Sequence, residues 1–318
     1  MKNIRTALAA SVFTLGALIA SPVVAWEPTK PIKLVVGFSP GGGTDAIART
    51  VASAAQEFFP VPLVIVNRSG ASGTLAAEFV ASSKPDGYTL LVAGGSESTS
   101  VGNHRPLKYD IRKDFTPIMR INRYRIFLAV NAKSGIKTVK DLVEKAKSAP
   151  GKMAFSSGGN GSLYHSAMLV FNRETGTDMK HVPYKGGALG LAALVGGHVD
   201  VGVGAALEVK PHVDSGKIVL IGHTSPDPTD AYPDVPTLQD EGYDIVLGNM
   251  KGFVGPAGMP ADVTQYLHDN FKKALETDTW KRLAKKQKID TAYANGPDFL
   301  EAMAGMYNVI GKAVKGTK

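Results

Sequence analysis

The sequence IKLVVGFSPGGGTD occupies residues 32–45 and contains a β-rich run, a glycine turn and the start of a helix. Residues 32–37 form the β-rich run, residues 39–43 interrupt it, and Thr44 and Asp45 open an amphipathic stretch over residues 46–59. Glycine and proline mark the turn, and the apolar spacing after it has the period of a helix. A strand that leads through a short turn into a helix is the repeating unit of α/β folds, so these residues predict that class.

The same order of elements returns twice along the chain. Residues 63–66, 74–82 and 88–93 are predicted as strand, helix and strand, with glycine-containing turns at 70–73 and 84–87. Residues 152–203 repeat the pattern, with strands at 152–155, 181–184 and 199–203 and helices at 162–174 and 188–195. Segments 32–93 and 152–203 thus share the order β-α-β-α-β, which predicts two α/β lobes with mainly parallel sheets.

Two extended runs lie where the chain is expected to pass between the lobes. Residues 127–131 and 249–255 are predicted as hinge segments, and helical segments near 261–275, 278–287 and 297–314 end the chain. Because the chain crosses twice, its C-terminal part completes the first lobe. We expect a signal peptide over residues 1–25, lobe 1 from residues 26–126 and 250–318, and lobe 2 from residues 127–249.

The N-terminus predicts export. Lys2 and Arg5 precede an uncharged stretch over residues 6–20, and the small residues of 21–25 end at Ala25, where we place the cleavage. A membrane anchor is the alternative interpretation, but the apolar stretch is shorter than the roughly 20 residues needed to span a bilayer. We therefore expect a soluble periplasmic protein.

Composition excludes several function classes. The 318 residues include no cysteine, which removes disulfide, zinc-thiolate, iron–sulfur and cysteine-nucleophile chemistry. The formal net charge of +8 falls to +6 once Lys2 and Arg5 are removed, and the lysines are dispersed. The densest basic run, residues 281–288, indicates the polar face of a helix. We expect no nucleic-acid partner.

Glycine loops before helices suggest an anion site. A helix N-terminus leaves backbone N–H groups unpaired and carries a partial positive charge, so a glycine loop there lets an anion approach several donors. Loops 39–45, 69–74 and 156–162 have this composition together with serine hydroxyls. The alternative is that glycine only supplies positive φ and close packing. Asp45 is expected to cap its own helix, with a ligand network as the other interpretation.

Catalytic and metal motifs are not supported. Residues 37–41 match G-x-S-x-G, but Pro40 lacks the N–H that the residue after a nucleophilic serine donates to an oxyanion. The glycine loops match neither nucleotide-binding motif. The histidines show no metal-ligand spacing, so each is interpreted as a surface or helix residue rather than a ligand; they are His104, His165, His181, His198, His212, His223 and His268. We expect no cofactor and no metal.

Longer motifs carry a resemblance to a known family. These are FSPGGGTD (38–45), NR (67–68) with GASG (70–73), KPDGYTLL (84–91), YD (109–110) with DFTP (114–117), GS (161–162) with His165, VPYKG (182–186), residues 194–200 and GPAGMP (255–260). In this order they resemble the exported solute receptors of tripartite tricarboxylate transporters, the Bug or TctC family. The resemblance implies a two-lobed type II periplasmic binding fold, or Venus flytrap, that closes on a small carboxylate.

The resemblance also implies where the ligand sits. Backbone N–H groups and ordered waters of loops 38–45 and 156–162 would hold one carboxylate. We expect the following ligand-binding residues: Phe38, Ser39, Gly41, Gly42, Asp45, Ser96, Ser156, Ser157, Gly158, Asn160, His165, Tyr184 and Ala205.

The sequence does not decide which chemical group the ligand carries at its far end, away from the bound carboxylate. Glu97 would repel a second carboxylate and favour an amino group or a neutral tail if it faced the cleft, but we expect it to be exposed to solvent. Phe253 is interpreted either as an apolar wall of the cleft or as packing at the hinge. The glycine loops contain no lysine or arginine, which favours recognition by backbone dipoles over a buried ion pair. Arg68 and Lys185 flank loops and would add only long-range attraction.

The resulting hypothesis is a receptor without catalysis. It would capture a small carboxylate (a di- or tricarboxylate, an aromatic acid or an amino acid) and deliver it to the membrane permease subunits of a tripartite tricarboxylate transporter. We expect a monomer. The alternatives are a ligand-sensing subunit of a two-component signalling system and a cleft enzyme that acts on a small organic acid.

Overall fold

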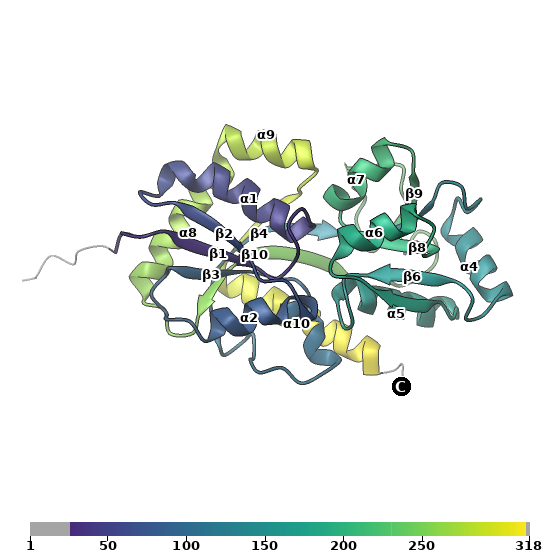
Figure 1. Cartoon of the computed structure of the whole chain (residues 1–318), viewed down its shortest axis with the longest axis horizontal. Coiled ribbons are helices and arrows are strands. Elements are labelled where there is room, and N and C mark those ends of the chain that lie inside the picture. The colour runs from purple at the N-terminus through teal and green to yellow at the C-terminus, as the bar shows by residue number, and fades with distance from the viewer. Residues whose placement is uncertain (1–25, 230, 316–318) are drawn as a thin grey trace, which may run out of the picture.

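The computed structural model describes residues 26–229 and 231–315, which form two α/β lobes side by side (Figure 1). The predicted signal peptide and its cleavage after Ala25 lie outside the described residues. Each lobe contains one sheet with helices on both faces. The two-lobed α/β fold predicted from the sequence is confirmed.

The sheet of lobe 1 contains six strands in the order β11-β4-β10-β3-β1-β2. The strands are β1 (Ile32–Val36), β2 (Leu63–Asn67), β3 (Thr89–Ala93), β4 (Phe115–Arg125), β10 (Gly248–Pro256) and β11 (Thr291–Asn295). β1 pairs in parallel with β2 and β3, whereas β10 runs antiparallel to β3 and β4, and β11 antiparallel to β4. Most strands of the sheet therefore point in one direction, as predicted.

Alternating side chains of the lobe 1 strands enter two cores. Leu34 of β1 packs in one core, against α1 (Gly43–Ala55), α8 (Ala261–Glu276) and α9 (Asp278–Gln287). Its neighbour Val35 packs in the other core, against α2 (Thr74–Ala81) and α10 (Gly296–Lys315). Shorter elements complete the lobe: α3 (Ser96–Thr99), η1 (Gln56–Phe58), η2 (Ala71–Gly73) and η3 (Val101–Asn103).

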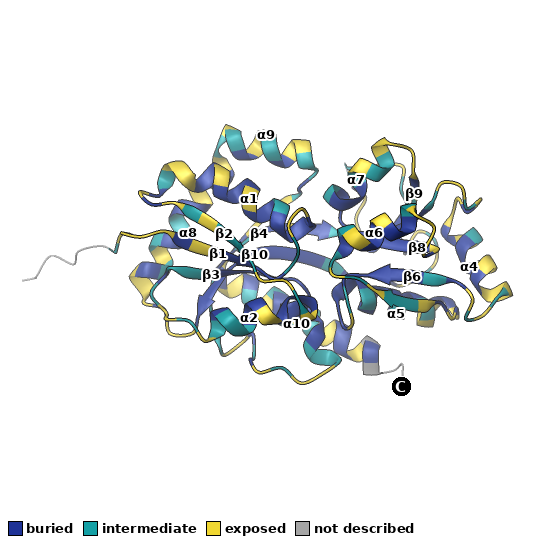
Figure 2. Cartoon of the chain, in the orientation of Figure 1, coloured by how far each residue is buried: buried dark blue, intermediate teal, exposed yellow. Residues whose placement is uncertain are grey.

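The sheet of lobe 2 contains five strands in the order β7-β6-β8-β5-β9. Its strands are β5 (Phe127–Asn131), β6 (Ala154–Ser157), β7 (Lys180–Pro183), β8 (Val201–Gly204) and β9 (Ile218–His223). Its helices are α4 (Val139–Ser148), α5 (Leu163–Thr175), α6 (Gly187–Val195) and α7 (Ala206–Asp214). α4 and α5 cover one face and α6 and α7 the other, so the interior strands β5, β6 and β8 are almost wholly buried (Figure 2), whereas the edge strand β7 has no buried residue.

The chain crosses between the sheets beside the segments predicted as hinges. Residues 127–131 form β5, an interior strand that pairs with both β8 and β9. Residues 249–255 likewise lie within β10, between β3 and β4. The crossings are at Ile126, between β4 and β5, and next to Gly248, since Leu247 still donates its N–H to Thr224 O of lobe 2. Both segments are therefore extended, and each is paired with a neighbouring strand on both sides.

The C-terminal helix connects both lobes, which the sequence did not predict. Phe299 and Met303 of α10 pack in the core of lobe 1. Ile310 and Val314, further along the same helix, pack in the core of lobe 2. The C-terminal part of the chain therefore belongs to both lobes.

A buried glycine in β10 provides a test of the central packing. A Cβ atom on Gly252 would lie 2.1 Å from Met119 O and 2.7 Å from the Phe299 ring. We expect Gly252→Ala to lower the free energy of unfolding by about 1–3 kcal/mol through overpacking, as measured by urea denaturation. The control is Gly305→Ala in α10, where a Cβ meets nothing within 4 Å and should add up to about 1 kcal/mol of stability. Equal stability of the two variants would contradict this account of the packing.

Candidate functional site

A cavity lies between the lobes, at the carboxyl ends of the parallel strands. Lobe 1 contributes residues 38–40 and 42–44, Gly95, Ser96, Tyr124, Asn249 and Lys251 to its lining, and lobe 2 contributes Gly158, residues 162–164, residues 185–189 and Glu208. Parallel α/β sheets bind ligands in this position because strand ends and helix starts meet there.

Helix N-termini surround this cavity. The first residues of α1 (Gly43), α3 (Ser96), α5 (Leu163) and α6 (Gly187) all line it. α7 begins at Ala206 and reaches the cavity through Glu208 in its first turn. Each N-terminus brings unpaired N–H groups and a partial positive charge, so the cavity is suited to an anion.

The chain's own groups occupy some of these donors. In the loop before α1, Gly41 donates its N–H to Asp45 Oδ2 (2.9 Å) and Gly42 donates to Ser39 O (3.2 Å). At the start of α5, Leu163 donates its N–H to Ser96 Oγ (2.9 Å). Gly41 and Gly42 are therefore not free for a ligand, whereas the N–H of Thr44, which lines the cavity, has no acceptor among the described residues.

The Glu208 carboxylate accepts three hydrogen bonds at the cavity. Its Oε1 accepts the Gly43 N–H of lobe 1 (3.2 Å), and its Oε2 accepts the Ala205 N–H (2.9 Å) and the Tyr164 hydroxyl (2.5 Å). Burial, and next the Glu208 carboxylate, raise the pKa of the Tyr164 hydroxyl well above its ordinary value. A carboxylate of the protein thus sits at the N-termini of both α1 and α7.

The N-terminus of α6 is left open. Its N-cap, Gly186, provides no side-chain cap, and among the described residues the N–H groups of Gly187 and Ala188 have no hydrogen-bond acceptor. Gly158 lies opposite: a Cβ on it would be 3.7 Å from the Gly187 nitrogen. Because glycine at 158 leaves this space free, an acceptor can reach the α6 donors from the cavity.

The lobes are in direct contact around the cavity. Ser39 Oγ donates to Lys185 O (3.1 Å), Ser72 Oγ donates to Asn160 O (2.9 Å), and Ser100 Oγ donates to Gly161 O (2.8 Å). These bonds, with the one from Gly43 to Glu208, join loops of lobe 1 to loops of lobe 2. The structure is the closed arrangement of a two-lobed clamp.

The structure brings five of the predicted ligand-binding residues to the cavity. They are Phe38, Ser39, Gly42, Ser96 and Gly158. The other eight lie outside its lining. Gly41 and Asp45 bond to each other, Asp45 also pairs with Arg49 and Asn67, and the Ala205 N–H goes to Glu208. Asn160 and Tyr184 line a neighbouring groove, while Ser156, Ser157 and His165 lie at and behind the end of β6.

Two further residues depart from their expected positions. Glu97 was expected to be exposed, but only 3% of it is accessible, so that prediction is wrong. Its Oε1 accepts from the Gly95 N–H and from Ser98 Oγ, both at 2.9 Å, which folds the side chain inward at the start of α3. Phe253 neither lines the cavity nor packs at a crossing; it stacks on Phe271 in the core of lobe 1, with ring centroids 4.4 Å apart.

Sequence reasoning missed Tyr124, Asn249, Lys251 and Glu208, all of which line the cavity. Lys251 and Glu208 each stand alone among apolar or small neighbours. The available signal was a single charged residue inside a buried strand or in the first turn of a helix, because charged side chains are rarely buried unless they are paired.

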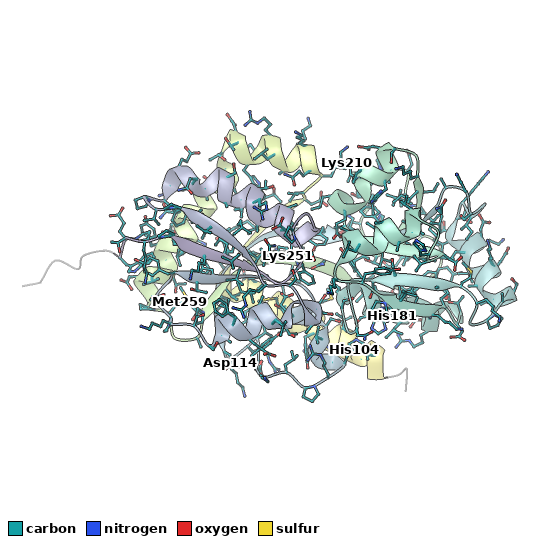
Figure 3. The ribbon with its side chains drawn as sticks, viewed as in Figure 1. His104, Asp114, His181, Lys210, Lys251 and Met259 are labelled. Carbon is teal, nitrogen blue, oxygen red and sulfur yellow. The ribbon has the colours of Figure 1, made fainter. Side chains whose placement is uncertain are left out.

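Three histidines from separate elements stack behind the cavity, a contact that the sequence analysis did not predict. His165 and His181 have ring centroids 3.8 Å apart, and His104 of lobe 1 stacks 5.3 Å from His165. Figure 3 labels His104 and His181 at the junction of the lobes. Burial, followed by the neighbouring histidines, lowers the pKa of His165 to about 3 and that of His181 to about 4. The rings are therefore packed as neutral groups.

Within residues 26–229 and 231–315, no group of three or more His, Asp or Glu side chains is arranged to hold a metal ion. In the same part of the chain, no helix has the length and apolar character required to cross a membrane.

Two α/β lobes that close over a cavity ringed by helix N-termini define the class of periplasmic solute-binding proteins. Residues 47–315 match the TctC family, described as the tripartite tricarboxylate transporter family receptor, and the chain belongs to this family. The resemblance found in the sequence is thereby confirmed. Receptors of this family are periplasmic and bind their substrate rather than convert it.

Relatives of known sequence and structure cover nearly the whole chain. A UPF0065 protein from the gbd 5′ region of Cupriavidus necator is 33% identical over 94% of this chain and 92% of its own length. A solved periplasmic transporter is 32% identical, with a TM-score of 0.87 over 91% of this chain and 97% of its own. Two Rhodopseudomonas palustris proteins both have a TM-score of 0.84: one solved with adipate (27% identical, 91% and 98% covered) and MatC, with bound malate (25% identical, 90% and 99% covered).

The histidine stack predicts a loss of stability in mild acid. The folded-state pKa values of His165 and His181 lie below the ordinary value of 6.5, so the unfolded chain binds more protons between about pH 4 and 6.5. Their contribution is fully present above pH 6.5 and is lost as the pH falls toward 4. We expect the free energy of unfolding to drop by about 2 kcal/mol between pH 7.5 and 5, after a reduction for partial exposure.

Urea denaturation at several pH values measures how steeply the free energy of unfolding falls as the pH is lowered, and His181→Asn should reduce this slope. An unchanged slope in the variant would show that other groups carry the acid dependence. NMR titration of the imidazole signals gives an independent readout of both pKa values.

Proposed function

We propose that this chain is a periplasmic receptor that captures a small carboxylate between its lobes and presents it to the membrane permease of a tripartite tricarboxylate transporter. The observation that carries the proposal is the open N-terminus of α6, whose Gly187 and Ala188 N–H groups face a cavity between two lobes in contact. The mature protein would begin after Ala25.

The ligand carboxylate would accept from α6 rather than from the loop before α1. Asp45, Ser39 and Glu208 already take the N–H groups of Gly41, Gly42 and Gly43, whereas α6 offers two adjacent donors and its positive dipole end. Gly158 forms the opposite wall without a side chain. Ser39 and Gly42 then shape the cavity, and the hydrogen bonds from Ser39 and Gly43 to lobe 2 hold it shut.

Relatives support the class of ligand. The R. palustris proteins with adipate and with bound malate have this fold and show that it accepts small organic acids. No side chain in the cavity of this chain is placed as a nucleophile with a neighbouring base, since Tyr164 donates to a carboxylate that is itself fully occupied. Binding followed by release to the permease is the function that fits.

A thermal-shift panel of small mono-, di- and tricarboxylates, including aromatic and amino acids, tests the proposal. A ligand at 100 times its Kd should stabilise the closed protein by about 2.7 kcal/mol, which raises Tm by several degrees. The absence of any stabilisation across the panel would refute carboxylate capture.

Filling the space at Gly158 tests the location of the site. Its Cβ has only ordinary contacts, the nearest at 3.6 Å, so Gly158→Leu should fold while its side chain covers the Gly187 N–H. We expect at least a hundredfold loss of affinity by isothermal titration calorimetry, with Tm within a few degrees of the parent. Gly305→Ala, on the exposed face of α10, is the control and should keep full affinity. Full affinity in Gly158→Leu would move the ligand away from α6.

A further inference from the structure

Three charged side chains are buried around the cavity, and the proposed carboxylate site does not account for them. Glu208 is 8%, Glu97 3% and Lys251 1% exposed. Figure 3 labels Lys251 near the centre of the molecule, where the lobes meet. Buried charges are stable only when they are paired or hydrogen-bonded, so each one has to be assigned its partners.

Lys251 has fewer partners than its ammonium group can use. It donates to Asn249 Oδ1 at 3.2 Å, and among the described residues no carboxylate lies within 4.0 Å of its Nζ. An ammonium has three donors; besides Asn249, the Tyr124 ring lies 5.7 Å from the Lys251 Nζ, and both Lys251 and Tyr124 line the cavity. Burial lowers the pKa of Lys251, and the carboxylates of Glu97 and Glu208 oppose that change.

Glu97 lies close to Lys251 and also lacks a partner on one side. Lys251 Nζ and Glu97 Oε2 are 2.5 and 2.8 Å from the point where a Cβ on Gly95 would sit, so they are at most about 5.3 Å apart. Glu97 Oε2 is buried without a hydrogen bond. Glu208 is different, because both of its oxygens are satisfied by Gly43, Ala205 and Tyr164. Lys251 is thus an ammonium with one hydrogen bond among the described residues, beside an unpartnered oxygen of Glu97, whereas Glu208 lies at the start of α6, its oxygens 2.8 and 3.0 Å from where a Cβ on Gly187 would sit.

We propose that the ligand is a monocarboxylate whose other end is an uncharged hydrogen-bonding group, such as an amide or a hydroxyl, that accepts from Lys251. This inference rests on the proposed function, in which the first carboxylate binds at α6. A second carboxylate on the ligand would be a second anion beside the ammonium that Glu97 already neighbours, in a region of low dielectric. A ligand ammonium would instead meet Lys251 directly. An uncharged acceptor satisfies Lys251 without either repulsion.

The test compares ligands that differ only at the far end. The ligands are titrated by calorimetry at pH 7.5 in sets of equal chain length, from three to six carbons. Each set contains the dicarboxylate, its half-amide, the ω-hydroxy acid and the ω-amino acid. The four-carbon set consists of succinate, succinamate, 4-hydroxybutanoate and 4-aminobutanoate. We expect the half-amide or the hydroxy acid to bind at least tenfold more tightly than the other two. A dicarboxylate or amino acid that binds as tightly would overturn the inference and leave the receptor function intact. No binding by any acid would refute the receptor function itself.

Two variants separate the roles of the buried charges. Lys251→Met should weaken the half-amide at least tenfold and leave the plain monocarboxylate of the same length nearly unchanged. Lys210→Met, on α7 and outside the cavity lining, is the matched control and should change neither ligand. Equal loss for both ligands in Lys251→Met would remove Lys251 from recognition of the far end.

Glu97→Gln keeps an oxygen for the Gly95 N–H and Ser98 Oγ and replaces the unpartnered oxygen, so it should fold even if Lys251→Met does not. We expect the affinity for the dicarboxylate relative to the half-amide to rise at least threefold. An unchanged ratio would show that the buried negative charge does not select the far end.

Discussion

The convergence of helix N-termini on one cavity is the constraint on which the rest of the structure depends. α1, α3, α5 and α6 all begin at this cavity, and α7 reaches it through Glu208. Each helix leaves N–H groups that its own backbone cannot satisfy, and buried N–H groups without acceptors are costly. The chain therefore places acceptors there: Ser96 for α5, Asp45 in the loop before α1, and Glu208 for both α1 and α7. At α6, the N–H groups of Gly187 and Ala188 have no such acceptor among the described residues.

Glu208 links this local requirement to the closed shape. Because it accepts from Gly43 in lobe 1 and from Ala205 in lobe 2, one carboxylate satisfies both lobes at once. It occupies the N–H of Gly43 in the loop that the sequence predicted for a ligand carboxylate. Its oxygens also lie 2.8 and 3.0 Å from where a Cβ on Gly187 would sit, so the same carboxylate that satisfies backbone donors places a negative charge at the cavity.

Local patterns predicted the elements of the fold well, and long-range contacts explain where prediction stopped. Residues 278–287 were predicted as a helix and form α9, since amphipathic spacing is a local signal. The glycine loops marked the right side of the sheets, and Phe38 and Gly158 do line the cavity. Which N–H groups stay open depends on Glu208, more than 160 positions from Gly43. The stack of His104, His165 and His181 joins three separate elements, and no spacing in the sequence reveals it.

Closure in this protein draws on contacts that need no ligand. Ser39, Ser72 and Ser100 donate across the gap to backbone carbonyls of lobe 2, and α10 is packed in the cores of both lobes. A ligand shifts a conformational equilibrium only by its difference in affinity between the two states. In the proposed binding mode the ligand would add contacts to α6 of lobe 2 and to Lys251 of lobe 1. Selectivity would then come from these donors, whereas the serine hydrogen bonds and α10 join the lobes without a ligand.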